Sequence, residues 1–230
     1  MADAGKYNKN QELYQSLVDK MYEEYDGGVN LPPEYGMFFE KDLLRLLIRL
    51  ARYKFVARQL TKNDTVLEVG SGSGVGTIFL GQHAKEAVGI DIKSTEVEEA
   101  RSINKRENVR FICDDFFAHE FANKFDAVVS LDVIEHLDAE NSDRFLTKIA
   151  TTLKENGFCI IGTPSLYSWE HQSDLSKASH EKCYDLPELR SLIEEHFGRT
   201  LVFSMNDELV HTGYYKMAWY YYVLAFYPKG

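Results

Sequence analysis

The sequence predicts an α/β fold, a doubly wound and mostly parallel seven-stranded sheet with an N-terminal helical extension. From residue 65 onward, short β-type runs alternate with helical patterns, which is typical of parallel βαβ units. Residues 66–76, VLEVGSGSGVG, have the pattern of a strand that enters a glycine-rich turn and then a helix. A chain of 230 residues with 44% hydrophobic content is long enough to bury one sizeable core.

Seven segments have the length and composition of strands. They are residues 65–69, 86–91, 109–113, 125–131, 157–163, 199–205 and 219–227. Helical patterns connect them at about 75–84, 94–106, 140–155 and 185–197. Residues 61–230 are therefore expected to form the sheet domain.

Residues 1–60 are expected to form a helical extension or cap. Leu13, Leu17 and Met21 are spaced four apart, which predicts a helix over residues 10–25. Glycines and paired prolines in residues 26–36 predict a break, and a second helix is expected at about 40–60. Basic side chains recur along that second helix and are interpreted as a solvated stripe: Lys41, Arg45, Arg49 and Arg52.

The glycine-rich turn follows the first strand, where open parallel sheets bind their ligands. Its glycines alternate with other residues: Gly70, Gly72, Gly74 and Gly76. None of them begins the pattern Gly-x-Gly-x-x-Gly that binds dinucleotides. A nicotinamide cofactor is therefore disfavoured.

Acidic residues accompany this turn in a fixed order. Glu68 precedes Gly70 by two residues, and Asp91 ends the second predicted strand. A carboxylate in that place can accept hydrogen bonds from both hydroxyls of a ribose, and it would repel a 2′-phosphate. Asp114, with Asp115 beside it, follows the third predicted strand.

This ordered set resembles the class I S-adenosylmethionine-dependent methyltransferases. The shared features are Glu-x-Gly-x-Gly-x-Gly, an acid after each of the next two strands, and a fourth-strand segment of the form FDxVxSxxVxEH, here Phe125 to His136. The resemblance covers residues 60–163 well and 180–197 loosely. It implies a Rossmann-like methyltransferase fold of the small-molecule type, with S-adenosylmethionine as cofactor and S-adenosylhomocysteine as product.

The resemblance also implies roles for individual residues. Asp114 is expected to contact the adenine amino group, Ile92 to pack on the adenine, and Gly70 to lie along the methionine half. The expected cofactor-binding set is Glu68, Gly70, Ser71, Gly72, Gly74, Asp91, Ile92, Asp114, Asp115, Ser130 and Leu131.

Two histidines are candidate catalytic residues. Methyl transfer is an in-line displacement, in which orientation can supply ~7–11 kcal/mol of the barrier, and an oxygen acceptor usually also requires a base. His136 follows the fourth strand on the ligand side of the sheet. His180 lies in the long polar connection 163–189. With Tyr184 and Leu189 after it, His180 is similar to a loop pattern in small-molecule members of the family. The alternatives are that His136 caps the next helix or packs against it, and that His180 is an ordinary surface residue.

The expected reaction is methyl transfer to a small-molecule acceptor, with oxygen as the favoured atom. The net charge of −10 argues against nucleic-acid partners, and SLDVIEH lacks the proline-aromatic motif of enzymes that methylate base amines. The alternatives are a non-catalytic cofactor-binding subunit and a nucleotide-sugar or nicotinamide enzyme on a related sheet. No metal site is expected, because His171, His180 and Cys183 fit no established zinc spacing.

The sequence predicts a cytoplasmic protein with no membrane partner. Residues 1–10 lack the apolar run of a signal or transit peptide, and the apolar stretch 217–227 is shorter than the ~20 residues of a membrane span. Three widely spaced cysteines suit a reducing compartment. The aromatic last strand could pack inside the monomer or pair across a homodimer.

Overall fold

The computed structural model describes residues 4–25, 28 and 30–229. The chain divides into two compact units, Met1–Leu31 and Pro32–Gly230. The first unit contains α1 (Ala4–Glu24), which begins earlier than the helix predicted over residues 10–25. Among the described residues, no helix combines the length and the apolar character that crossing a membrane requires.

The second unit is built on an eight-stranded sheet in the order β3-β2-β1-β4-β5-β8-β6-β7. The strands are β1 (Thr65–Val69), β2 (Glu86–Asp91), β3 (Val109–Cys113), β4 (Phe125–Leu131), β5 (Leu153–Pro164), β6 (Phe197–Asn206), β7 (Leu209–His211) and β8 (Tyr220–Pro228). The first five in this order are parallel, whereas β8, β6 and β7 join by antiparallel pairing. The predicted α/β class and mostly parallel sheet are confirmed.

The prediction of seven strands is wrong by one. The additional strand, β7, has three residues and forms a hairpin with β6. Asp207 in the turn has φ = 51°, a conformation that Asp adopts more readily than most residues. So short a run has too few residues to show the alternation by which a strand is recognised.

The aromatic strand β8 lies inside the sheet, between β5 and β6. It pairs with both neighbours along most of its length, and Tyr221 and Tyr222 are fully buried. Of the two arrangements left open for this strand, the structure therefore shows packing within one chain.

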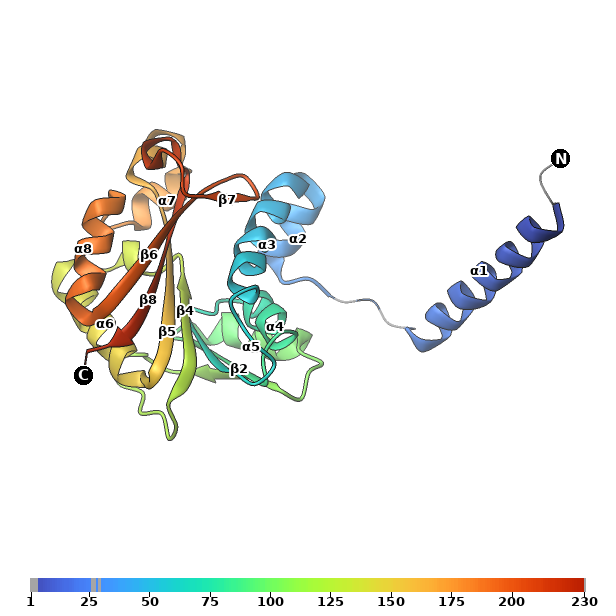
Figure 1. Ribbon diagram of the computed structural model, residues 1–230, viewed down its shortest axis with the longest axis horizontal. Helices are drawn as coiled ribbons and strands as arrows, with labels where there is room; N and C mark the ends of the chain where they lie inside the picture. Colours follow the sequence, from blue (N-terminus) through green and yellow to red (C-terminus); the bar gives the residue numbers. More distant parts are fainter. Residues whose placement is uncertain (1–3, 26–27, 29, 230) are drawn as a thin grey trace. The chain divides into compact units, whose positions relative to one another are not determined.

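Helices cover both faces of the sheet (Figure 1). On one face lie α6 (Ala139–Thr152) and α8 (Leu186–His196), which bury Phe145, Ile149 and Ile193 in the larger core cluster. The opposite face is covered by α3 (Leu43–Ala57), α4 (Val75–Gly81) and α5 (Ser94–Ile103). This two-sided cover explains why the central strands are mostly apolar.

The helix predicted at about 40–60 is two helices, α2 (Pro33–Lys41) and α3. Asp42 separates them with φ = −155°, and its carboxylate accepts a hydrogen bond from the Arg45 N–H at 3.0 Å. Pro33 occupies the first turn of α2, where an N–H has no partner in the helix anyway. The helix therefore begins inside the segment that was expected to be a break. Both helices belong to the second unit, so its boundary lies after Leu31 instead of at residue 60.

Gly76 in α4 allows α3 to approach closely. A Cβ at this position would collide with the ring of Tyr53, which is buried in α3. We expect Gly76→Ala to lower the free energy of unfolding by about 1–3 kcal/mol, as overpacking of a core does. Urea denaturation measures the change.

The matched control is Gly36→Ala in α2, where nothing lies within 4 Å of the added Cβ. That substitution is expected to leave the free energy of unfolding unchanged or to raise it by about 0.4–1 kcal/mol. Equal stability of the two variants would contradict the close approach of α3 and α4.

Candidate functional site

The glycine-rich turn connects β1 to α4 at the carboxyl edge of the sheet. Gly70, Gly72 and Gly74 have φ values of 77°, 49° and 82°, which are accessible to glycine without strain. The Gly70 N–H donates to the Ile90 carbonyl at 2.9 Å, and the Gly72 N–H donates to the Asp91 carboxylate at 2.8 Å. The predicted turn and the predicted carboxylate therefore lie in direct contact.

Asp91 keeps hydrogen-bonding capacity for a ligand. One carboxylate oxygen accepts from Gly72 and the other from the Lys93 N–H at 2.9 Å. Each ionised oxygen has a further lone pair, so two more donors, such as the hydroxyls of a ribose, have acceptors here. Ile92 follows with 68% of its surface exposed, and it offers a flat ring an apolar face.

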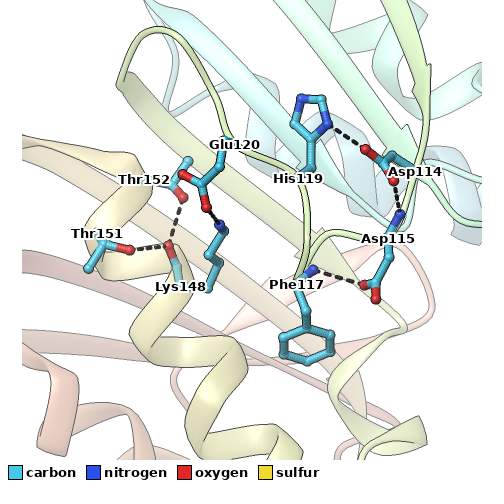
Figure 2. A network of polar contacts seen from close by, with 8 residues as sticks. All are labelled: Asp114, Asp115, Phe117, His119, Glu120, Lys148, Thr151 and Thr152. Carbon is cyan, nitrogen blue, oxygen red and sulfur yellow. Dashed lines mark hydrogen bonds and ion pairs between the residues drawn. The ribbon is translucent and has the colours of Figure 1, made fainter.

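Asp114 lies next to Asp91 because β2 and β3 are parallel neighbours. Its N–H donates to the Asp91 carbonyl at 3.1 Å. Figure 2 shows its carboxylate between the His119 ring, at 2.8 Å, and the Asp115 N–H, at 2.9 Å. The His119 hydrogen bond lowers the pKa of Asp114. No sequence pattern indicated His119, because its contact with Asp114 depends on how the loop folds back after β3.

Asp115 turns toward its own loop. Its carboxylate accepts a hydrogen bond from the Phe117 N–H at 2.9 Å (Figure 2). Further along, Glu120 forms an ion pair with Lys148 of α6 at 3.0 Å (Figure 2). These contacts hold the loop that carries Asp114.

Gly74 has a packing reason to be glycine. A Cβ there would collide with Ala100 of α5 and approach the ring of Phe111 of β3. Gly70 differs, because its Cβ would collide with Val133 in the loop after β4. That close approach brings the β4 loop against the glycine turn, so the two halves of the candidate site are adjacent.

Two buried hydroxyls lie in the elements that form this edge. Ser71 is in the turn, and Ser130 is in β4, which pairs with β1. Neither hydroxyl oxygen has a hydrogen-bond partner among the described residues. Because buried polar groups nearly always find a partner, these hydroxyls fit the polar half of a bound ligand. Leu131, the next residue, is buried at the end of β4.

Two arginines of α3 form ion pairs with acidic residues. Arg52 forms a 2.6 Å ion pair with Asp132 and stacks on the Tyr220 ring at 3.9 Å, and Arg49 pairs with Glu34 at 2.5 Å. The interpretation of a solvated basic stripe is therefore wrong for these two residues. Their partners are distant in sequence or in a different helix, so helical spacing could not reveal the pairing.

Asp132 itself has a positive φ of 59°. Non-glycine residues rarely adopt this conformation, and it is most common at functional sites. It turns the chain sharply between β4 and the 3₁₀ helix η1 (Ile134–His136). This turn places η1 at the carboxyl edge of the sheet.

The two predicted catalytic histidines face each other. The ring centroids of His136 and His180 are 4.9 Å apart. His136 Nδ1 donates to the Ser179 carbonyl at 2.7 Å, and because a carbonyl only accepts, the lone pair of His136 is on Nε2. The alternative role as a helix cap does not apply, since Asp138 caps α6 by accepting from the Asn141 N–H.

Glu135 completes this part of the site and was not selected from the sequence. Its side chain is fully buried, and one carboxylate oxygen accepts from the Thr163 hydroxyl at 2.9 Å. Burial raises the pKa of Glu135, and the charge of Asp132 raises it further. The signal available from the sequence was its place beside His136, as the Glu of the segment FDxVxSxxVxEH.

Comparison with known proteins identifies a domain within the sheet unit. Residues 66–157 match the family described as "Methyltransferase domain". This segment is a methyltransferase domain, and it contains the features that resemble the class I S-adenosylmethionine-dependent methyltransferases. The matched residues run from β1 into β5 and include the glycine turn, Asp91 and His136.

Curated relatives of this chain include both N- and O-methyltransferases. A phosphoethanolamine N-methyltransferase of Plasmodium falciparum is 33% identical over 106 residues, which are 45% of this chain and 40% of the relative. A ubiquinone biosynthesis O-methyltransferase of Coxiella burnetii is 26% identical over 121 residues, or 51% of each chain. The chain thus spans about half the length of the curated relatives it matches.

A solved structure shows the same fold. The crystal structure of a SAM-dependent methyltransferase from Thermotoga maritima superimposes with a TM-score of 0.65 at 17% identity, and the match covers 84% of this chain and 94% of that one. The similarity in fold therefore extends well beyond residues 66–157.

Glu68 gives the stability of the protein a testable pH dependence. It is buried beneath the glycine turn, where it accepts from the Thr77 hydroxyl at 2.5 Å. Burial raises the pKa of Glu68 from 4.5 to about 7, and the Thr77 and Tyr53 hydroxyls offset part of the rise. The folded protein thus binds a proton more tightly here than the unfolded chain does. Stability should fall as the pH rises from 4.5 to about 7, and then level off.

We expect Glu68→Gln to remove up to about 3 kcal/mol of this fall in the free energy of unfolding. Urea denaturation across that pH range measures it. Glu98→Gln, at an exposed position of α5, should keep the wild-type dependence. Parallel curves for the wild type and the Glu68 variant would show that this carboxyl is not responsible.

Proposed function

We propose that this methyltransferase moves the methyl group of S-adenosylmethionine to a hydroxyl oxygen of a small-molecule acceptor. The observation that carries the proposal is His136, whose Nδ1–H bond to the Ser179 carbonyl leaves Nε2 as a proton acceptor. The loop that carries His136 closes against the glycine turn through Val133 and Gly70. The proton acceptor and the candidate cofactor site are therefore neighbours.

The cofactor supplies an electrophilic methyl group on a sulfonium. In this proposal Asp91 accepts from the ribose hydroxyls, Asp114 faces the adenine amino group, and Ile92 packs on the adenine. The methionine half lies along five further residues of the predicted set: Gly70, Ser71, Gly72, Ser130 and Leu131. The spare lone pairs of Asp91, the exposed Ile92 and the unpartnered hydroxyls of Ser71 and Ser130 all support this fit.

In this proposal a residue of the chain accepts the proton of the acceptor hydroxyl. The acceptor hydroxyl gives its proton to His136 Nε2 while the oxygen forms a bond to the methyl carbon and the carbon–sulfur bond breaks. The sulfur leaves as a neutral thioether, and the imidazolium later releases the proton to water. The Ser179 carbonyl stabilises the imidazolium through the 2.7 Å hydrogen bond to Nδ1.

A small-molecule acceptor is supported by the charge of the chain. A net charge of −10 repels phosphate backbones. The three cysteines, Cys113, Cys159 and Cys183, are free thiols, which supports placing the reaction in the cytoplasm.

A second candidate is an amine acceptor. Asp132 and Glu135 place two carboxyl groups beside the histidine pair, and one oxygen of each lacks a protein partner among the described residues. Carboxylates of this kind suit a cationic amine. The relative from Plasmodium falciparum is an N-methyltransferase by name.

The test has two stages. Calorimetry should detect binding of S-adenosylhomocysteine and none of NAD; the reverse would overturn the proposal. A screen of metabolite pools with methyl-labelled cofactor should then yield a labelled small molecule, and fragmentation by mass spectrometry should locate the label on oxygen. A label on nitrogen would instead establish the amine candidate.

A further inference from the structure

Three donor groups converge beside the β4 loop. Glu135, His136 and His180 each offer one ligand atom, and these atoms lie within 4.8 Å of one another. Two imidazole nitrogens and one carboxylate oxygen are a donor set that suits Zn²⁺, Mn²⁺, Co²⁺ and Fe²⁺. Three protein ligands also leave coordination positions open, as in catalytic metal sites.

Glu135 gives independent support for a ligand here. The residue is fully buried, yet its Oε1 has no hydrogen-bond partner among the described residues, while Oε2 accepts from Thr163 at 2.9 Å. A buried carboxylate oxygen without a partner costs free energy. A cation held between Glu135 and the two histidines would satisfy it.

The ligands are held in place by a surrounding set of hydrogen bonds. The Ser179 carbonyl fixes the His136 ring and directs its Nε2 lone pair away from that contact. The N–H groups of Glu181 and Lys182 donate to the Glu135 carbonyl at 2.8 and 3.0 Å. These bonds fasten the segment that carries His180 to η1, and metal sites are commonly organised by such second contacts.

The local charge also favours a cation. Asp132 acts electrostatically on both Glu135 and His180, and its Oδ1 has no partner among the described residues. Arg52 pairs with the other oxygen of Asp132. The carboxyl groups of Asp132 and Glu135 therefore lie near a single guanidinium, that of Arg52. An added cation would interact favourably with the second carboxyl group.

We propose that Glu135, His136 and His180 bind one divalent transition-metal cation, and that this cation holds the acceptor oxygen beside the transferable methyl group. The second half rests on the proposed function, whereas cation binding does not. In the loaded protein His136 Nε2 is a metal ligand, so the cation replaces His136 as the group that assists loss of the acceptor's proton. The cation then promotes loss of the acceptor's hydroxyl proton to water, and the oxygen takes the methyl group as the carbon–sulfur bond breaks.

A second acidic cluster provides the control. Asp143, Glu195 and His196 also lie within 4.8 Å of one another. Its two acids are exposed, and the His196 ring forms a 3.0 Å contact with Asp143. This cluster has the character of a solvated surface ion pair.

The experiment titrates Co²⁺ into the chelator-stripped full chain and follows binding by calorimetry and visible absorption. Wild type should bind one cation. Glu135→Gln and His180→Ala should weaken binding by more than 10-fold, and Thr163→Val should weaken it by about 10-fold through loss of the bond that orients Glu135. His196→Ala and His171→Ala, which leave the proposed ligands intact, should bind as wild type does.

Two results would overturn the cation site. One is the absence of saturable Co²⁺ binding to wild type; the other is binding that survives in Glu135→Gln and His180→Ala but is lost in His196→Ala. Circular dichroism verifies that each variant folds. If a variant does not fold, broadening of wild-type histidine NMR signals by Mn²⁺ decides: His136 and His180 should broaden before His171, and the opposite order refutes the site.

Binding of S-adenosylhomocysteine in the presence of chelator separates this inference from the proposed function. If the protein binds S-adenosylhomocysteine but not Co²⁺, only the proposed cation site is refuted. Co²⁺ binding without cofactor-product binding refutes the proposed function and leaves the cation site established.

Discussion

Replacing Asp91 with alanine is expected to raise the dissociation constant for S-adenosylhomocysteine by at least about 100-fold. The reason is the loss of the two charge-assisted hydrogen bonds that we propose between Asp91 and the ribose, each of which contributes about 1.5–3 kcal/mol. The substitution also removes the acceptor that fixes the Gly72 and Lys93 N–H groups. Isothermal titration calorimetry measures the change.

Two further variants sharpen this test. Asp91→Asn retains the shape but loses the charge, so its affinity should lie between that of wild type and that of the alanine variant. Asp143→Ala removes an exposed acid on α6 and should bind the cofactor product as wild type does. Unchanged affinity in the Asp91→Ala variant would place the ribose elsewhere.

Replacing His136 with alanine should lower kcat by about 10²–10⁴-fold, the usual contribution of a positioned acid or base. The loss is expected whether His136 accepts the proton directly or binds a cation, because both roles use Nε2. The affinity for S-adenosylhomocysteine should be unchanged, since no predicted cofactor contact is removed. Labelled methyl transfer to the acceptor found by the screen measures kcat.

His171→Ala is the matched control. His171 lies against Trp219, with ring centroids 5.3 Å apart, and is exposed. Its loss should leave kcat unchanged. A wild-type kcat in the His136→Ala variant would mean that the acceptor does not need His136 to remove its proton. This would be the case for a nucleophile that is already deprotonated.

The cofactor half of the site was predictable because it depends on chain order. Asp91 ends β2 and Asp114 directly follows β3, and the carboxyl ends of adjacent parallel strands meet at one edge of the sheet. The structure accordingly places Asp91 on the Gly72 N–H and Asp114 beside it. The strands themselves were visible as apolar runs, because helices bury both faces.

The other half depended on contacts between distant segments. Glu135 is a ligand candidate only because the segment carrying His180 folds onto η1 through the Ser179 carbonyl. Arg52 is not part of the expected solvated stripe, because its side chain donates a hydrogen bond to Asp132, which lies 80 residues away in the sequence. His119 reaches Asp114 only through the path of its loop.

The sequence by itself therefore determined the α/β class, the glycine turn and the carboxylates beside it, since each follows from local patterning and the geometry of parallel strands. The tertiary structure alone decided which side chains surround His136, and it added the short strand β7. The physical reason is that burial, ion pairing and ligand geometry arise from atoms brought together across the chain, and local spacing does not encode those distances.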